Sequence, residues 1–234
     1  MLDNSLKQQF LELSNKEFGE KTRGSTEQYT DVLEVVTEGG LPLAKHIERQ
    51  DDDCYAVFYA VKDERFFYTH YFEVSGQVKL VGDDITPATA VYFRVYSDNL
   101  SLTELLDITT LKTSRRWQKG DLKNQNPTFP LFYNRKIITT TFKDSGFFYE
   151  PNTNEAGNFE KKIDELLIDL ESHKQELSKL TKAGCYMYIS AYWHSYYGNT
   201  MLGEIHLNKQ IIKRLSDLDL EINFDLYTGG KPFN

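Results

Sequence analysis

The sequence predicts an α+β protein built of two units, in each of which helices pack on a mixed or antiparallel sheet. One observation is the segment 158–180, where large apolar residues recur at helical spacing opposite a charged face. A second is a series of short segments rich in Tyr, Phe, Val and Ile, as is typical of strands. A third is the length of 234 residues, which exceeds the roughly 100 to 150 of a common domain. We therefore expect units 1–86 and 87–234.

Composition and charge restrict the class of protein. Hydrophobic residues make up 40% and charged residues 26% of the chain, as in globular proteins. A net charge of −8 argues against general binding to nucleic acid, which requires a surplus of Lys and Arg. The same charge suits a basic protein partner, although an acidic excess also simply keeps proteins in solution. Without a long apolar run or a signal-like start, we expect a cytoplasmic protein that makes no membrane contact.

The first unit begins with a helix. Apolar residues at helical spacing predict it over 6–18, with Asn4 or Ser5 as its N-terminal cap and Gly19 as its end. The segment 29–36 is rich in strand-forming residues and is expected to be a strand.

A hairpin follows in the first unit. The segments 54–61 and 65–74 are strongly strand-forming and are joined by three polar residues, a length typical of hairpins. A third short strand is expected over 77–81, and we place the boundary between the units at 82–87. The segment 41–47 fits either a strand or a short helix.

The second unit opens with a strand over 89–96, in which apolar and polar residues alternate as in a strand with one buried face. A short helix over 101–108 follows, with Ser101 as its cap and Glu104 in the capping-box position. The basic segment 112–123 is expected to be irregular.

The remaining elements are arranged around the long amphipathic helix, which is expected to cover the sheet of the second unit. One further strand, which hardly contains a polar residue, is expected to be central and covered on both faces. The predicted ranges are 136–142 and 146–149 as one bent strand or a hairpin, 158–180 as the helix, 186–193 as the central strand, 209–215 as a helix capped by Asn208, and 220–227 as a closing strand.

Recognisable catalytic motifs are missing from the sequence. The histidines have no spacing typical of metal ligands, although His194 and His206 bracket a loop rich in Tyr and Gly that would allow the two rings to converge. Cys54 and Cys185 lie in apolar runs and are expected to be free thiols. No nucleophile elbow or phosphate-binding loop occurs. We therefore expect a protein that is not an enzyme and that uses no cofactor or metal.

The basic loop around Trp117 is the first candidate site. Arg115, Arg116 and Lys119 surround this tryptophan, and such a cluster is able to bind an anion. The alternative interpretation is that Trp117 anchors the loop on the sheet while the charged groups stay in solvent.

Clustered carboxylates form the second candidate site. Asp51, Asp52 and Asp53 are consecutive, and Asp83 and Asp84 lie at the expected boundary between the units. Both groups are candidates for binding a basic partner. Alternatively, these acidic residues serve as ordinary turn and strand-end residues.

The second unit resembles a bacterial family known as domain of unknown function 4279, over about 88–230. The resemblance rests on the strand 91–96, the loop 113–121, the long helix and the closing segment 218–227. The segment that is usually rich in Trp reads Gly-Phe-Phe-Tyr over 146–149 here. The first unit resembles no family that we recognise. The family has no established activity, but proteins similar to it are small, cytosolic and bacterial, a setting that also contains immunity proteins of toxins.

Two functional hypotheses follow from these observations. The first is a non-enzymatic protein-binding module, most concretely an immunity protein that occludes a cognate toxin through an acidic or aromatic surface. The alternative is a ligand-binding or regulatory protein, in which the Trp117 loop and the segment 192–198 line a pocket for a small anion.

Overall fold

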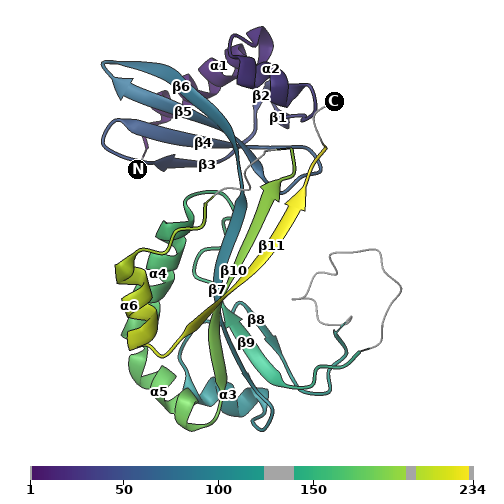
Figure 1. Ribbon diagram of the computed structural model, residues 1–234, viewed down its shortest axis with the longest axis vertical. Coiled ribbons are helices and arrows are strands. Elements are labelled where there is room, and N and C mark those ends of the chain that lie inside the picture. The colour runs from purple at the N-terminus through teal and green to yellow at the C-terminus, as the bar shows by residue number, and fades with distance from the viewer. Residues whose placement is uncertain (1, 124–139, 199–203, 232–234) are drawn as a thin grey trace.

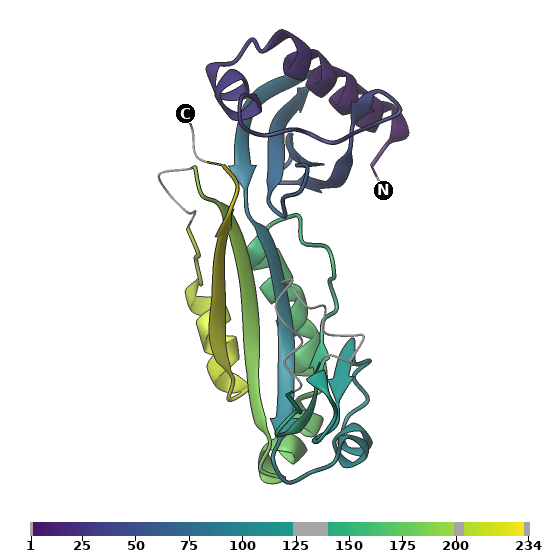
Figure 2. The same ribbon diagram turned by 90° about the vertical axis from the view of Figure 1, so that its right-hand side faces the viewer.

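The structure is a computed structural model that describes residues 2–123, 140–198 and 204–231. The described residues form an α+β fold of six helices and three sheets. The four-stranded and five-stranded sheets lie end to end along the molecule (Figures 1 and 2). The helices are α1 (Asn4–Glu20), α2 (Gly24–Thr30), α3 (Leu102–Ile108), α4 (Phe159–Ser172), α5 (Lys174–Lys182) and α6 (Lys209–Asp217).

The first two sheets are antiparallel and belong to the N-terminal part of the chain. Their strands are β1 (Thr37–Glu38) and β2 (Leu41–Pro42) in one sheet, and β3 (Ala44–Arg49), β4 (Cys54–Ala60), β5 (Phe67–Ser75) and β6 (Gln77–Thr86) in the other. The predicted hairpin is confirmed as β4 and β5, and the ambiguous segment 41–47 is extended. Helix α1 packs on the four-stranded sheet, where Phe10 is fully buried against Phe72.

The predicted strand 29–36 is wrong, because Tyr29 lies in α2 and only Val35 makes a single β-bridge, to Val61. Hydrogen bonds to a distant strand outweigh the local strand propensity of this segment. The hydroxyls of Ser25 and Thr26 in α2 both bond to the Asp83 carboxylate on β6.

The segment 82–87, where we placed the boundary, is mostly strand, since β6 continues through Thr86 opposite Phe67. Pro87 alone separates β6 from β7 (Ala88–Ser97), so the chain passes directly from one sheet into the next. Tyr196, at the end of β10, packs in the N-terminal core with its ring 5.2 Å from that of Phe66. The sheets are therefore in contact, and the division into domains 1–86 and 87–234 stays a prediction.

The five-stranded sheet is mixed and carries its helices on one face (Figure 1). Its strand order is β11 (Glu221–Gly229), β10 (Tyr186–Tyr196), β7, β9 (Ser145–Tyr149) and β8 (Arg115–Trp117). Strands β10 and β11 are parallel because α6 connects them, whereas the other pairs are antiparallel. The sheet's inner face buries Phe93, Ile189 and Trp193 in one core with residues of α4, α5 and α6.

The single helix predicted over 158–180 is two helices, α4 and α5, which meet at His173. The ring Nδ1 of His173 lies 2.8 Å from the carbonyl oxygen of Asp169. The Ser172 hydroxyl donates to the same carbonyl oxygen at 2.6 Å, and serine bonds of this kind compete with the helical ladder. Both halves nevertheless bury the predicted apolar stripe.

Local signals identified several other elements correctly. Helix α3 has the predicted capping box of Ser101 and Glu104, and Asn208 caps α6. The segment 112–123 was predicted to be irregular, but it contains the edge strand β8. Of the range 136–142, residues 136–139 lie outside the described residues, while 146–149 belongs to β9. Among the described residues, no helix is long and apolar enough to cross a membrane.

Candidate functional site: a cavity on the open face of the sheet

The two faces of the five-stranded sheet differ in chemistry. On the face without helices, Tyr92 lies opposite Ser190, and Arg94 lies opposite Tyr188. Side chains alternate between faces along a strand, so this open face carries every second residue of β7 and β10. The prediction that the 186–193 strand is covered on both faces is wrong, because Tyr188, Tyr192 and His194 on the open face remain partly exposed.

An arginine held among aromatic rings forms the centre of the open face. The Arg94 guanidinium lies 5.3 to 5.5 Å from four ring centroids, those of Tyr96, Trp117, Phe148 and Tyr188. Its Nη1 donates a hydrogen bond of 2.7 Å to the Tyr188 hydroxyl. Cation–π contacts of this kind are favourable, and more so away from water. The open face is therefore built from aromatic and cationic side chains instead of aliphatic ones.

A cavity of about 530 Å³ opens on this face, within the usual size of small-molecule sites. Strands β7, β10 and β11 form its floor, the segment after β9 forms one wall, and the turn between β4 and β5 contributes an arginine. The lining residues are Arg65, Ala90, Tyr92, Arg115, Glu150, Thr153, Glu155, Tyr192, His194, Asp225 and Tyr227.

A continuous network of hydrogen bonds orders one side of the cavity. Arg65 donates from Nη2 to Glu155 at 2.7 Å and from Nη1 to the Tyr192 hydroxyl at 3.1 Å. The same hydroxyl lies 2.9 Å from Nδ1 of His194. The Arg65 guanidinium also lies 5.1 Å from the Tyr192 ring centroid. These groups therefore hold one another in position.

The electrostatics of the cavity are mixed. Burial raises the pKa of the Glu150 carboxyl above its ordinary value, although Arg115, 3.6 Å away, partly opposes this. Burial, together with the nearby Arg65 charge, lowers the pKa of His194 below its ordinary value, so this ring is neutral at pH 7. Burial raises the pKa of the Tyr192 hydroxyl, which therefore stays protonated. Three carboxylates and two arginines thus supply the charges of the lining.

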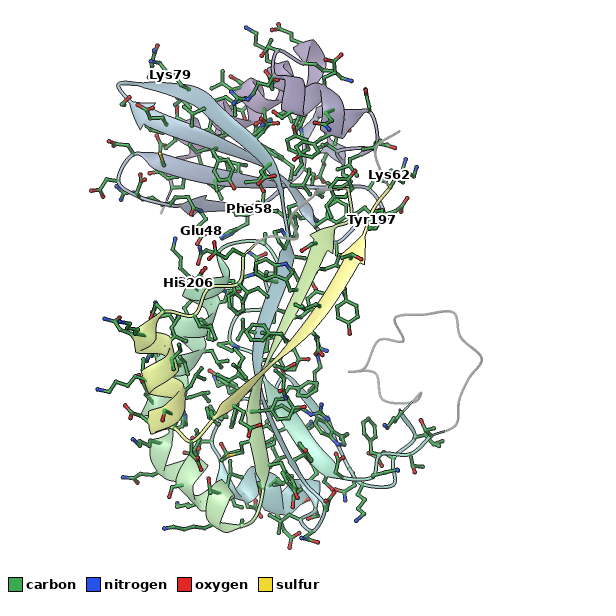
Figure 3. All side chains as sticks on the ribbon, viewed as in Figure 1. Glu48, Phe58, Lys62, Lys79, Tyr197 and His206 are labelled. Carbon is green, nitrogen blue, oxygen red and sulfur yellow. The ribbon has the colours of Figure 1, made fainter. Side chains whose placement is uncertain are left out.

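A second cavity of about 550 Å³ lies at the junction of the two large sheets, where Figure 3 shows Glu48, Phe58 and His206. The polar side chains of this cavity already form bonds that connect the four-stranded sheet to the start of α4. Glu48 accepts a hydrogen bond from the Asn158 backbone and pairs with Lys161 at 2.9 Å. We therefore interpret this cavity as a structural junction. His206 lines it whereas His194 lines the open-face cavity, so the two histidines do not converge.

Beside the junction lies a buried lysine. Lys162 is 4% exposed, and its Nζ donates to the carbonyl and hydroxyl oxygens of Thr89 and to the carbonyl oxygen of Glu155. Burial lowers its pKa to about 8. All three acceptors are neutral, so this ammonium ties α4 to β7 and to the segment after β9.

A serine of α1 and a histidine of β5 have the composition of a catalytic dyad. Ser14 Oγ lies 2.7 Å from His70 Nδ1 and 2.6 Å from the Tyr59 hydroxyl. All three residues are 0% exposed, and Phe18 stacks on the His70 ring. A substrate therefore has no access to this pair, which serves the core instead.

The four candidate residues of the basic loop lie in different surroundings. Of its four candidate residues, only Arg115 lines the cavity. Trp117 is 1% exposed and donates to Asp144 at 2.6 Å, so the structure agrees with the interpretation that it anchors the loop. Lys119 donates to the Asp98 carbonyl oxygen. Arg116 points to the opposite face from Arg115 because strand residues alternate.

The acidic candidates are also separated. Asp51, Asp52 and Asp53 are exposed in the turn between β3 and β4, where Asp51 accepts bonds from the backbone of Asp53 and Cys54. The Asp83 side chain is 1% exposed and pairs with Arg23 at 2.9 Å, so it is not available as a partner-binding group.

Asp84, beside it, is exposed. Its carboxylate accepts a hydrogen bond of 2.7 Å from the backbone of Ile85. The two neighbouring acids therefore differ in role, although the sequence presented them as a pair.

Several residues of the cavity were not anticipated from the sequence. Tyr192 and His194 belong to the segment 192–198, which was expected to line a pocket with the basic loop, whereas Arg65 and Glu155 come from distant segments that only the fold brings together. One sequence signal was present, since Tyr186, Tyr188 and Tyr192 share one parity along a strand otherwise rich in apolar residues. That spacing predicts an aromatic, hydroxyl-bearing face.

The fold and the cavity define an α+β protein whose five-stranded sheet has helices on one face and an aromatic-lined cavity on the other. The family model described as "Domain of unknown function (DUF4279)" matches residues 86–229. The chain therefore belongs to this family. No curated protein and no solved structure matches the chain. Among the described residues, no group of three or more His, Cys, Asp and Glu is arranged to hold a metal ion.

Proposed function

We propose that this protein is a non-enzymatic binding protein that takes a small organic ligand into the cavity on the open face of its five-stranded sheet. The observation that supports this proposal is the ordered network of Arg65, Glu155 and Tyr192 in a cavity of about 530 Å³. Sites of this size with a few fixed polar groups are typical of small-molecule binding. The titratable groups in this network hydrogen-bond to one another, and polar groups fixed in this way suit the recognition of a ligand.

The small anion expected from the basic loop has less support. Arg116, Trp117 and Lys119 do not line the cavity, and its lining carries more carboxylates than arginines. The lining therefore carries an excess of one negative charge, which disfavours an anion. We therefore retain the hypothesis of a ligand-binding protein, but we do not propose an anion as its ligand.

Filling the cavity tests this proposal. Ala90 is 9% exposed in the cavity floor, so Ala90→Phe should occupy the space and abolish ligand-induced shifts in an amide NMR screen of small polar and charged molecules. Ala183→Phe, at an exposed position after α5, is the matched control and should bind as the unaltered chain does. If no molecule in the screen shifts the cavity amides of the unaltered chain, the proposal is wrong.

A second candidate is binding to a basic protein, with immunity to a cognate bacterial toxin as its most concrete form. The observation in its favour is that Asp51, Asp52 and Asp53 are all exposed in one turn. Complementary charge of this kind accelerates association. A toxin partner would be occluded by this turn and by the surface beside it.

Capture from native cells followed by kinetics tests the second candidate. Asn substitution at all three aspartates should slow association with a captured basic partner and weaken its salt dependence. The matched control neutralises Asp217, Asp219 and Glu221, three exposed carboxylates near the start of β11. Equal rates for both triple variants would remove the acidic turn from the proposal.

A further inference from the structure

The charges of the open-face cavity do not balance. Arg65 is paired with Glu155, and Arg115 lies beside Glu150. Asp225 lies on the edge strand β11 and is exposed at the mouth of the cavity, where its carboxylate accepts one hydrogen bond, of 3.2 Å from Ser190 Oγ, and forms no ion pair among the described residues. One negative charge of the lining therefore lacks a cationic partner in the described part of the chain.

The walls around this carboxylate are aromatic. Asp225 lies opposite Tyr192 in the parallel ladder of β10 and β11, and Tyr227 follows it on the same face. The ring centroids of Tyr192 and Tyr227 are 5.2 Å apart. The faces of such rings carry negative charge density and attract cations.

The cavity already accommodates one cation in this way. The Arg65 guanidinium lies over the Tyr192 ring while it pairs with Glu155. An aromatic ring and a carboxylate thus bind a guanidinium together. Asp225 with Tyr227 offers a second combination of the same kind, without a cation from the described residues.

This inference rests on the proposed function. We propose that the ligand is a small organic cation whose ammonium or guanidinium group binds at Asp225 beside the tyrosine rings. Hard metal ions take several oxygen ligands, whereas ring faces favour an organic cation. The volume of the cavity suits a whole small molecule.

Three probes of equal heavy-atom number and different charge test the inference on the full chain: butylguanidinium, hexanamide and hexanoate. Amide NMR titration should give butylguanidinium a Kd about tenfold below that of hexanamide, with shifts at Ala90 and Tyr192. Hexanoate should bind most weakly. Equal or tighter binding of hexanamide or hexanoate in the cavity would overturn the inference that the ligand is a cation. The proposed binding function would still stand.

Variants locate the charge that is responsible. Asp225→Asn should raise the Kd for butylguanidinium about tenfold, while Ser190 is still able to donate to the Asn oxygen. Asp219→Asn, which removes the same charge from an exposed turn residue outside the lining, should leave it unchanged. Tyr227→Leu should weaken binding because it removes a ring. Unchanged affinity in Asp225→Asn would contradict the inference.

The test separates the two proposals and the possible sources of the cation. If none of the three probes and no molecule of the screen shifts the cavity amides, the proposed function fails as well. If a peptide rich in Lys or Arg binds while butylguanidinium does not, the cation comes from a protein side chain and the small-molecule inference is wrong.

Discussion

Nη1 of Arg65 lies 3.1 Å from the hydroxyl of Tyr192, so a hydrogen bond joins the turn after β4 to the floor of the five-stranded sheet. Arg65 also pairs with Glu155, and both side chains are about one-third exposed. A single residue of the turn between β4 and β5 therefore lines the cavity on the five-stranded sheet.

The first prediction concerns this link. Arg65→Met should lower the free energy of unfolding by about 1 kcal/mol, since it removes one partly exposed ion pair and one hydrogen bond. Urea denaturation measures the change. Lys16→Met is the matched control, because Lys16 pairs, among the described residues, only with the exposed Glu20 one turn along α1, and it should cost less than about 0.5 kcal/mol. Equal losses in both variants would show that the link contributes no more than a surface pair.

The second prediction concerns the close approach of Gly146 to the aromatic cluster. A Cβ at this position would overlap the Trp117 ring and the carbonyl oxygen of Val95. Gly146→Ala should therefore destabilise the fold by about 1 to 3 kcal/mol. Gly19 in α1 has open space around it, so Gly19→Ala should be neutral or stabilising by up to about 1 kcal/mol. Thermal or urea unfolding distinguishes the two, and a harmless Gly146→Ala would contradict the packing described.

The third prediction concerns Asp83 and Asp84. Burial alone raises the pKa of Asp83, but the hydrogen bonds accepted by its carboxylate outweigh this effect and keep the pKa below its usual value. Asp83→Asn places an amide among donors and should cost about 2 to 4 kcal/mol in unfolding free energy. Asp84→Asn, at an exposed neighbour, should cost less than about 0.5 kcal/mol. Similar stability of the two variants would argue against the structural role of Asp83.

The fourth prediction is a pH dependence that originates at His70. Burial lowers the pKa of His70 to about 4, whereas its ordinary value is 6.5. The unfolded chain therefore binds a proton more readily, and stability that is complete above pH 6.5 is lost as the pH falls toward 4. Between pH 7.5 and 5 this contribution should fall by about 2 kcal/mol.

His70→Gln isolates this contribution, because glutamine does not titrate. The variant should show a flatter decline of the urea midpoint between pH 7.5 and 5 than the unaltered chain. Carboxylates titrate mainly below this interval, so they affect both proteins alike. Parallel pH profiles would exclude His70 as the origin.

Elements with a complete local signal were predictable. The capping box of Ser101 and Glu104 and the Asn208 cap are satisfied within one helical turn, so neighbouring residues suffice to specify them. Tyr29 shows the limit of such reasoning. It has the composition of a strand residue, but α2 is held by bonds from Ser25 and Thr26 to Asp83, nearly sixty residues away along the chain.

The candidate site likewise contains residues whose place the sequence predicted and residues whose place depends on the fold. Arg115 was identified from its basic surroundings and does line the cavity, because alternation along β8 directs it to the open face. Trp117 lies on the same face, but it is buried against Arg94 and Phe148 and does not line the cavity. Exposure of a tryptophan depends on which strands become its neighbours, and the sequence does not state them.

The sequence by itself determined the α+β class, the hairpin of β4 and β5, the caps of α3 and α6 and the apolar stripe of α4 and α5, because these depend on periodicity and on contacts within a few residues. The cap of α1 is Asp3 and not the predicted Asn4 or Ser5. The tertiary structure alone decided which face of the five-stranded sheet stays open and which charges meet there. Arg65, Glu155, Tyr192 and Asp225 are far apart along the chain, and only the pairing of strands brings them into one cavity.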